Sequence, residues 1–298
     1  MKKVSICIPC YEQPQNLQKC LKSIKQQSFK DFEVIITDDS KINDLTNVIQ
    51  DFKNNFEIKY IKNITAKGSP ENWNEAIKNA QGRYIKILHH DDYFKETDSL
   101  EQFVRLLEEN PSAKVVFCSS YHVDNEGHYV SSHTLTQSNM RMVQQDAKKL
   151  YLGNVIGAPS VMMYHKDLNR YFDKRMKWLV DIDFYIQLLK DNSFVYTNKE
   201  LIAINIGEEQ RVTKECENNA KISIYEHMIL FEKLQLSVLP LSYKLYFIKL
   251  FLKFKVFNKE QIRSYGYSGN LEYISSIFKY VKLLYPLYLV LKNKKKVY

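Results

Sequence analysis

The apolar residues of the first ninety positions fall into two alternating patterns. Short runs rich in Val, Ile, Tyr and Phe predict buried strands, and the segments between them carry apolar residues on one helical face. The predicted strands span residues 4–9, 32–37, 58–61 and 84–88, and the predicted helices span residues 16–27, 45–54 and 69–80. In the third helix, Ser69 is the expected N-cap, Pro70 the first helical residue, and Gly82 the stop signal. Strands that alternate with helices of this length predict βαβ units and an α/β fold with a parallel sheet.

The rest of the chain continues this alternation and then becomes helical. Further helices are predicted at 100–109 and 184–190, and further strands at 114–119 and 161–164. From Ile222 onward the pattern is helical and increasingly rich in lysine. Because the composition changes near Pro240, we expect one α/β domain over residues 1–240 and a helical tail over residues 241–298.

The positive charge of the chain lies in this tail. Of the formal net charge of +9, residues 241–298 contribute +10, from twelve Lys or Arg and two acids, so the preceding body is close to neutral. A nucleic-acid-binding body would carry its own basic stripe, and this one does not. In segment 246–253 lysines alternate with large apolar residues, a pattern typical of basic amphipathic helices that lie on anionic membranes. The alternative is a helical cap whose apolar face packs on the rest of the protein.

Cysteine usage and apolar runs indicate where the protein resides. There are five cysteines, an odd number without framework spacing, which suits a reducing compartment. The N-terminus runs directly into a strand pattern without a signal-peptide apolar region. The longest late apolar run, 283–291, contains Pro286 and is far shorter than the ~20 residues that span a bilayer. We expect a cytoplasmic protein that is peripheral on the inner face of the cytoplasmic membrane.

Two pairs of adjacent acids follow predicted strands. Ligands of open α/β sheets bind at the carboxyl ends of the strands, where Asp38–Asp39 and Asp91–Asp92 fall. Successive strand side chains point to opposite faces, so at most one of Asp38 and Asp39 can face a given pocket, and both could equally form a turn. Carboxylates at Asp91 and Asp92 suit a divalent cation that neutralises a diphosphate. An iron site that adds His89–His90 is the alternative, which strand alternation opposes.

A third acidic group, Asp181 and Asp183, lies in the first turn of a predicted helix. Acids in the first turn stabilise a helix by interacting with its dipole, and the spacing alone favours this structural role over a catalytic one.

The ordered set of motifs resembles the family 2 glycosyltransferases, which have the GT-A fold, over roughly residues 3–215. The quoted segments are VSICIPCY at 4–11, LKSI through QSF at 21–29, FEVIITDDS at 32–40, NWN through AQGRYI at 72–85, LHHDD at 88–92, where the family has its DxD segment, and Val180–Asp181, where the family has Glu-Asp. The resemblance implies a GT-A type, Rossmann-like, mostly parallel sheet flanked by helices, with the helical tail as a C-terminal extension. It departs from the family at His89, in place of the first acid of DxD, and at Val180, in place of Glu.

The resemblance also implies roles for individual residues. Pro9 and Tyr11 would border the nucleobase, and Asp39 would bond its imide. Asp91 would face the ribose or the metal, and Asp92 would bind the metal. Asp181 would be the general base, with Asp183 as the fallback, and Arg211, on an expected flap at 207–213, would lie near the diphosphate.

The implied activity is inverting transfer of one sugar from a nucleotide-diphosphate sugar, by default a UDP-sugar. Mn²⁺ or Mg²⁺ would be the cofactor, and a glycan or lipid-linked glycan of the bacterial surface the acceptor. The chain lacks the QxxRW motif of processive synthases, which favours single addition. The alternatives are a nucleotidyltransferase, which would carry a Gly- and Lys-rich phosphate loop unlike 4–11, and a non-catalytic sugar- or membrane-binding module on the same fold.

Overall fold

The computed structural model describes residues 2–207 and 216–294 and consists of two compact units. The first comprises Met1–Leu150, Asn154–Lys174 and Val180–Glu209, and the second comprises Tyr151–Gly153, Arg175–Leu179 and Gln210–Tyr298. The boundary expected near Pro240 falls inside the second unit, so the units differ from the predicted domains chiefly by the segment 210–240.

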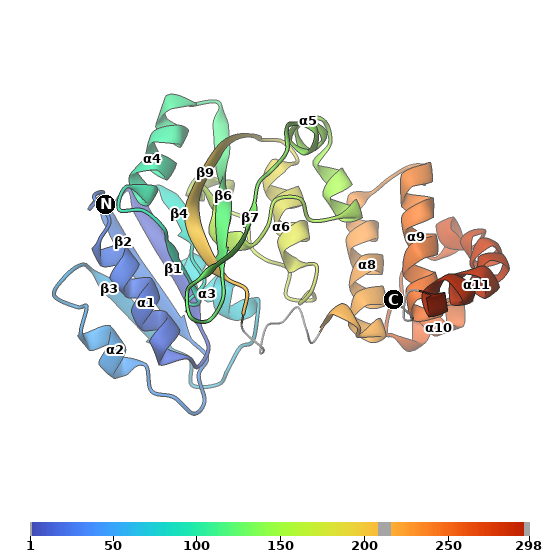
Figure 1. The fold of residues 1–298 in the computed structure, drawn as a ribbon, viewed down its shortest axis with the longest axis horizontal. Helices are drawn as coiled ribbons and strands as arrows, with labels where there is room; N and C mark the ends of the chain where they lie inside the picture. The colour runs from blue at the N-terminus through green and yellow to red at the C-terminus, as the bar shows by residue number, and fades with distance from the viewer. Residues whose placement is uncertain (1, 208–215, 295–298) are drawn as a thin grey trace. The chain divides into compact units, whose positions relative to one another are not determined.

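The first unit is built on one nine-stranded sheet in the order β3-β2-β1-β4-β8-β6-β9-β5, with β7 paired to β6 (Figure 1). The strands are β1 (Val4–Cys10), β2 (Phe32–Asp38), β3 (Ile58–Lys62), β4 (Tyr84–Ile87), β5 (Asp92–Phe94), β6 (Ala113–Val123), β7 (Tyr129–His133), β8 (Met162–His165) and β9 (Ser193–Asn205). Strands β3, β2, β1 and β4 run parallel, whereas β8 is antiparallel to both β4 and β6. The parallel half is the part that the alternating sequence pattern predicted.

The helices of the first unit are α1 (Pro14–Lys25), α2 (Thr46–Gln50), α3 (Glu71–Asn79), α4 (Ser99–Glu109), α5 (Gln137–Gln145) and α6 (Val180–Leu189). The predicted apolar face of α1 is buried. Helix α2 is shorter than predicted. The predicted start of α3 is wrong: the helix begins at Glu71, with Pro70 as an N-cap that makes no side-chain bond.

The carboxyl ends of β1, β2 and β4 meet at one edge of the sheet, because β1 lies between the other two and pairs in parallel with both. Helix α3 packs against β1 and β2. The chain leaves β4 at Ile87, turns, and enters the short strand β5 at Asp92, which pairs with β9. This edge therefore gathers both predicted acidic pairs.

The second unit contains the helices that the lysine-rich pattern predicted. They are α8 (Ala220–Leu234), α9 (Leu241–Phe254), α10 (Lys259–Ser264) and α11 (Ile277–Lys294), drawn in orange to red in Figure 1. Its core is aromatic: the ring of Tyr151 lies 5.7 Å from Phe231 and 5.4 Å from Tyr243, and Phe231 stacks on Tyr273 at 4.7 Å. Within the described part of the chain, no helix has the length and apolarity needed to cross a bilayer.

Candidate active site

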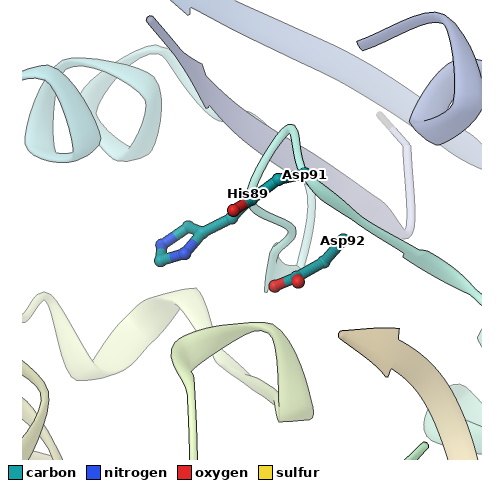
Figure 2. Close-up of side chains that lie close together, drawn as sticks. All are labelled: His89, Asp91 and Asp92. Atoms are coloured by element: carbon teal, nitrogen blue, oxygen red, sulfur yellow. The ribbon is translucent and has the colours of Figure 1, made fainter. Parts of the chain in front are cut away.

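The turn after β4 brings three potential metal ligands together. The ligand atoms of His89, Asp91 and Asp92 all lie within 4.8 Å of one another, and Figure 2 shows the three side chains projecting from this one turn. The turn is closed by the amide of Asp92, which donates to the carbonyl of His89 at 3.0 Å. Because the strand has ended at Ile87, neighbouring side chains are not forced to opposite faces. One imidazole and two carboxylates fit a divalent cation such as Mn²⁺ or Mg²⁺.

His90 is not a member of this group and joins the turn to the loop after β1. Its Nδ1 lies 3.2 Å from the carbonyl oxygen of Pro9, and its Nε2 lies 3.1 Å from Oε1 of Gln13. The alternative iron site with both histidines is therefore not formed. The cluster includes His89, which the sequence suggested as a ligand only in the alternative iron site and which occupies the place of the first acid of the DxD segment.

The loop after β1 is held in an unusual backbone conformation. Glu12 and Gln13 have φ values of 53° and 56°, in the left-handed region that non-glycine residues rarely occupy. The Glu12 carboxylate accepts from the amides of Lys41, Ile42 and Asn43, at 2.7, 3.1 and 2.8 Å. Burial alone would raise the pKa of Glu12, but these amides lower it below its usual value. The loops after β1 and β2 are thus bound together, and strain of this kind is common at functional sites.

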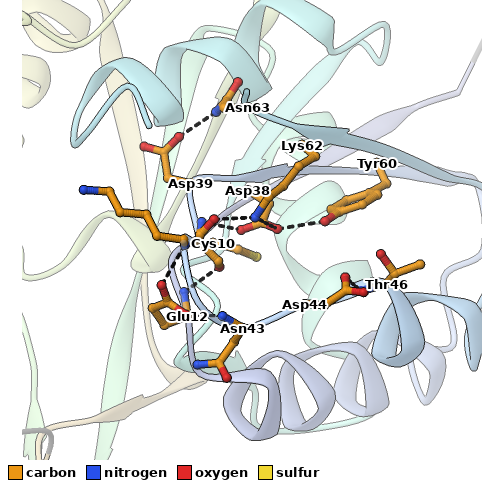
Figure 3. Close-up of polar contacts among 12 residues, drawn as sticks. Cys10, Glu12, Asp38, Asp39, Asn43, Asp44, Thr46, Tyr60, Lys62 and Asn63 are labelled. Carbon is orange, nitrogen blue, oxygen red and sulfur yellow. Dashed lines mark hydrogen bonds and ion pairs between the residues drawn. The ribbon is translucent and has the colours of Figure 1, made fainter. Parts of the chain in front are cut away.

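The two acids that end β2 diverge, as predicted. Asp38 is fully buried and accepts from the hydroxyl of Tyr60 at 2.7 Å and from Nζ of Lys62 at 2.9 Å, which makes it a structural residue (Figure 3). Asp39 points the other way and accepts from Nδ2 of Asn63 at 2.7 Å and from the amide of Gly68 at 2.7 Å. Of the pair, Asp39 is the one held beside the segment that leads into α3.

Asn72 is a further residue at this edge that sequence reasoning did not single out for a role. Its Nδ2 lies within hydrogen-bond distance of the carbonyls of Cys10, at 3.2 Å, and Thr37, at 3.1 Å, so it ties the ends of β1 and β2 together. The next residue, Trp73, packs its ring 4.6 Å from the ring of His89. The motif Asn-Trp-Asn therefore supports the metal turn, a role that only its position in the family pattern could have suggested.

Asp181 lies in the first turn of α6, as predicted, in surroundings that suit a base. Its Oδ1 is buried, and no donor among the described residues lies within hydrogen-bond distance of it. Burial raises the pKa of Asp181 to about 7, where a carboxylate is a useful base near neutral pH. Asp183 differs, because its Oδ2 accepts from Nε2 of Gln187 at 2.6 Å.

The face of α6 that carries Asp181 packs on a glycine-containing segment of the first unit. Tyr185, one helical turn after Asp181, donates its hydroxyl to the carbonyl of Gly157 at 3.0 Å.

Tyr11 is half exposed, at 50%, at the end of β1, whose residue Pro9 is buried. Arg211 and most of the expected flap lie outside the described residues.

A second acidic group, Asp124, Glu126 and His128, joins β6 to β7. It is accounted for by the turn itself, since the amide of His128 donates to Oδ1 of Asp124 at 2.8 Å.

Comparison with known proteins gives one family. The profile described as Glycosyl transferase family 2 matches residues 5–172. The GalNAc(5)-diNAcBac-PP-undecaprenol beta-1,3-glucosyltransferase of Campylobacter jejuni is 27% identical over 224 residues, which cover 74% of this chain and 70% of that protein. In three further relatives the matched part covers 63%, 33% and 65% of their length.

Solved structures share the fold. Residues 1–349 of Staphylococcus aureus TarS, solved in complex with UDP-GlcNAc, give a TM-score of 0.64 at 18% identity, covering 89% of this chain and 76% of that one. The mannosyltransferase PcManGT of Pyrobaculum calidifontis, in complex with GDP-Man and Mn²⁺, gives a TM-score of 0.58 at 12% identity, covering 95% and 80%.

Proposed function

The chain belongs to the family 2 glycosyltransferases, and on that premise we propose that it moves one sugar from a UDP-sugar to a lipid-linked glycan. The observation that carries the proposal is the convergence of His89, Asp91 and Asp92 at the carboxyl edge of the parallel strands, where α/β sheets bind nucleotides. The names of the Campylobacter relative and of the TarS complex support the lipid-linked acceptor and the UDP-sugar donor.

The donor would lie across the ends of β1, β2 and β4. Pro9 and Tyr11, whose ring is half exposed, would border the nucleobase. Asp39, held by Asn63 and by backbone amides, would accept from the imide of uracil. Asp91 would face the ribose or the metal.

The diphosphate would lie over the turn after β4. Asp91 and Asp92, with His89, would hold Mn²⁺ or Mg²⁺, which would neutralise the charge that develops on the leaving diphosphate. Two carboxylates without a cation would repel the donor, so the turn itself favours a metal-dependent reaction.

Asp181 would act as the general base. Its Oδ1, which has no hydrogen-bond partner among the described residues, would take the proton of the acceptor hydroxyl as the hydroxyl oxygen forms its bond to the anomeric carbon. The bond from this carbon to the diphosphate breaks in the same displacement, and the electron pair leaves with the diphosphate. Attack from the opposite face inverts the anomeric configuration. Arg211 is proposed to lie near the diphosphate.

The second unit would hold the enzyme at the inner face of the cytoplasmic membrane. Helix α11 leaves a set of large apolar side chains exposed, namely Tyr280, Leu283, Leu284, Leu287, Leu289, Val290 and Leu291. Lys279, Lys282 and Lys292 lie on the same helix. Exposed apolar side chains with lysines suit a surface of anionic lipid, which is where a lipid-linked acceptor resides.

A panel of nucleotide sugars incubated with Mn²⁺ tests the function. We expect hydrolysis of one UDP-sugar and a thermal shift with that donor, both lost in excess EDTA and restored by Mn²⁺. Full turnover in EDTA would refute the metal site. Turnover of no nucleotide sugar would favour a non-catalytic binding module instead.

A further inference from the structure

A lysine lies fully buried in the strand that leads to the metal turn. Lys86 is the third residue of β4 and has no exposed surface. Burial lowers the pKa of Lys86 to about 7. Burying an ammonium group is unfavourable, and a methionine would fill similar space without that cost. Its presence therefore calls for a contact that an apolar side chain could not make.

The contacts of Lys86 reach a neighbouring segment. Its Nζ donates to the carbonyl of Ser160, to that of Met162 at 3.3 Å, and to that of Ile87 at 3.1 Å. It also lies 4.5 Å from the centroid of the Phe103 ring. Lys86 thus fixes the 3₁₀ turn η2 (Pro159–Val161) and the start of β8 against the end of β4.

Ser160 passes this constraint on to the metal turn. The residue is fully buried, and its hydroxyl accepts from the amide of His89 at 3.0 Å. The carbonyl of His89 in turn accepts from the amide of Asp92 at 3.0 Å. Ser160 therefore links the two sides: its carbonyl accepts from the Lys86 amine and its hydroxyl accepts from His89, whose carbonyl accepts from Asp92.

We propose that Ser160 and Lys86 are positioning residues of the cation site, a role that rests on the metal binding proposed above. The turn from β4 to β5 follows the end of a strand, so its shape depends on side-chain bonds more than on strand pairing. Groups that orient the ligands of a metal without touching it commonly change its affinity 10–100-fold when removed. Ser160 would set the direction of His89, and Lys86 would keep Ser160 in place.

The main test is the affinity for Mn²⁺ of the full chain carrying Ser160→Ala. Free Mn²⁺ is followed by electron paramagnetic resonance, first with Mn²⁺ alone and then with UDP added. The substitution removes the bond to His89 but keeps the carbonyl that Lys86 binds, so Kd should rise ~10-fold while thermal unfolding in EDTA stays cooperative. Ser119→Ala is the matched control, because this buried hydroxyl bonds Tyr196 on another part of the sheet, and its Kd should equal that of the wild type.

Lys86→Met and Asp92→Ala complete the test. Removing whatever positive charge Lys86 carries near its pKa of about 7 cannot by itself weaken cation binding, so weaker Mn²⁺ binding by Lys86→Met would support positioning, and unchanged or tighter binding would overturn it. Wild-type affinity in Ser160→Ala would overturn the role of Ser160. Asp92→Ala tests the metal site separately: wild-type binding there, or no binding by the wild type with or without UDP, would refute the site itself.

Discussion

Asp181 carries a carboxyl group in surroundings that favour its neutral form. Replacing it with Asn keeps its size but removes its ability to take a proton. General-base assistance contributes ~10²–10⁴-fold, so we expect kcat to fall by that factor in Asp181→Asn while donor affinity is unchanged. Steady-state kinetics with the preferred donor measures both. The control is Asp183→Asn, and a large loss there with none in Asp181→Asn would assign the base to Asp183.

The same burial predicts how activity depends on pH. The pKa of Asp181 is raised to about 7, so the basic form accumulates only above that pH. The kcat of the wild type should rise with pH through about 7 and level off above it. A flat profile between pH 5.5 and 8.5 would show that another group, or a step other than proton transfer, limits the rate.

Stability should change in the opposite sense. A carboxyl whose folded-state pKa is raised stabilises the fold below its unfolded pKa, and this contribution is lost as pH rises through about 7. Asp181→Asn is free of this cost, so its Tm should exceed that of the wild type by a margin that grows from pH 5 to pH 8. Differential scanning fluorimetry at several pH values measures it. A Tm difference that does not change with pH would mean that the Asp181 carboxyl does not have the raised pKa.

Single residues also show where sequence reasoning succeeds. The divergence of Asp38 and Asp39 follows from strand geometry alone, and the structure confirms it. The contribution of His89 could not be derived that way, because it depends on the strand ending at Ile87, which no local signal marks. Lys86 was missed for a related reason: a lysine inside an apolar strand pattern gives no indication of which carbonyls it meets.

At the scale of elements, strongly apolar strands were predictable. Strands β1 to β4 begin where the pattern placed them and end within one residue of it. Strands β1, β2 and β4 are continuous buried runs between turn signals, whereas β3 is only partly buried and carries Ile58, Tyr60 and Ile61 next to lysines. Strand β5 has three residues, and β7 consists of Tyr, Val, Ser, Ser and His, so neither carries a usable pattern. Both are formed through tertiary pairing, to β9 and β6.

The segment that leads into α6 offers a test of one such tertiary contact. Glu226 on α8 is buried, and its carboxylate accepts from the backbone amides of Lys177, Trp178 and Leu179, each at 2.8 Å. Burial raises the pKa of Glu226, although these amides act in the opposite direction. In Glu226→Gln the new NH₂ group cannot accept from the amides it faces, so we expect a loss of ~1–3 kcal/mol in the free energy of unfolding.

Urea unfolding of the full chain measures this loss. Glu232→Gln is the matched control, because Glu232 lies on the same helix and accepts from the hydroxyl of Tyr267 at 3.2 Å, and it should lose less. Equal losses in both variants would mean that the three amides are satisfied in another way when Glu226 is replaced.

At the scale of the whole molecule, the basic segment of the sequence coincides with helices of the second unit. The net charge of +10 beyond residue 240 was evident from the sequence, and the structure places the corresponding helices in the second unit. The sequence did not reveal that α8 belongs to that unit as well. Its apolar residues pack into the aromatic core with Tyr151, a long-range contact that composition cannot indicate.

The exposed residues of α11 lead to a prediction about membrane binding. Leu283, Leu287 and Leu291 are 73%, 57% and 55% exposed and recur every four residues along one helix face. The full chain should float with liposomes that contain anionic lipid, and binding should weaken with salt because exposed charges are screened. Replacing all three leucines with Gln should abolish flotation without destabilising the fold, since the side chains are exposed. Replacing Lys279, Lys282 and Lys292 with Gln should weaken binding by about 150-fold, from ~1 kcal/mol per basic residue.

The control for these variants is a chain in which Ile42 and Ile64, exposed apolar residues of the first unit, are replaced by Gln. If nonspecific binding of any exposed apolar residue to lipid caused flotation, this variant would lose binding as the leucine variant does. If α11 is the docking surface, it should float like the wild type. The leucine variant should still hydrolyse the donor in solution, because membrane contact brings the enzyme to its acceptor and takes no part in the displacement. Flotation of the leucine variant equal to that of the wild type would show that α11 is not the surface that meets the bilayer.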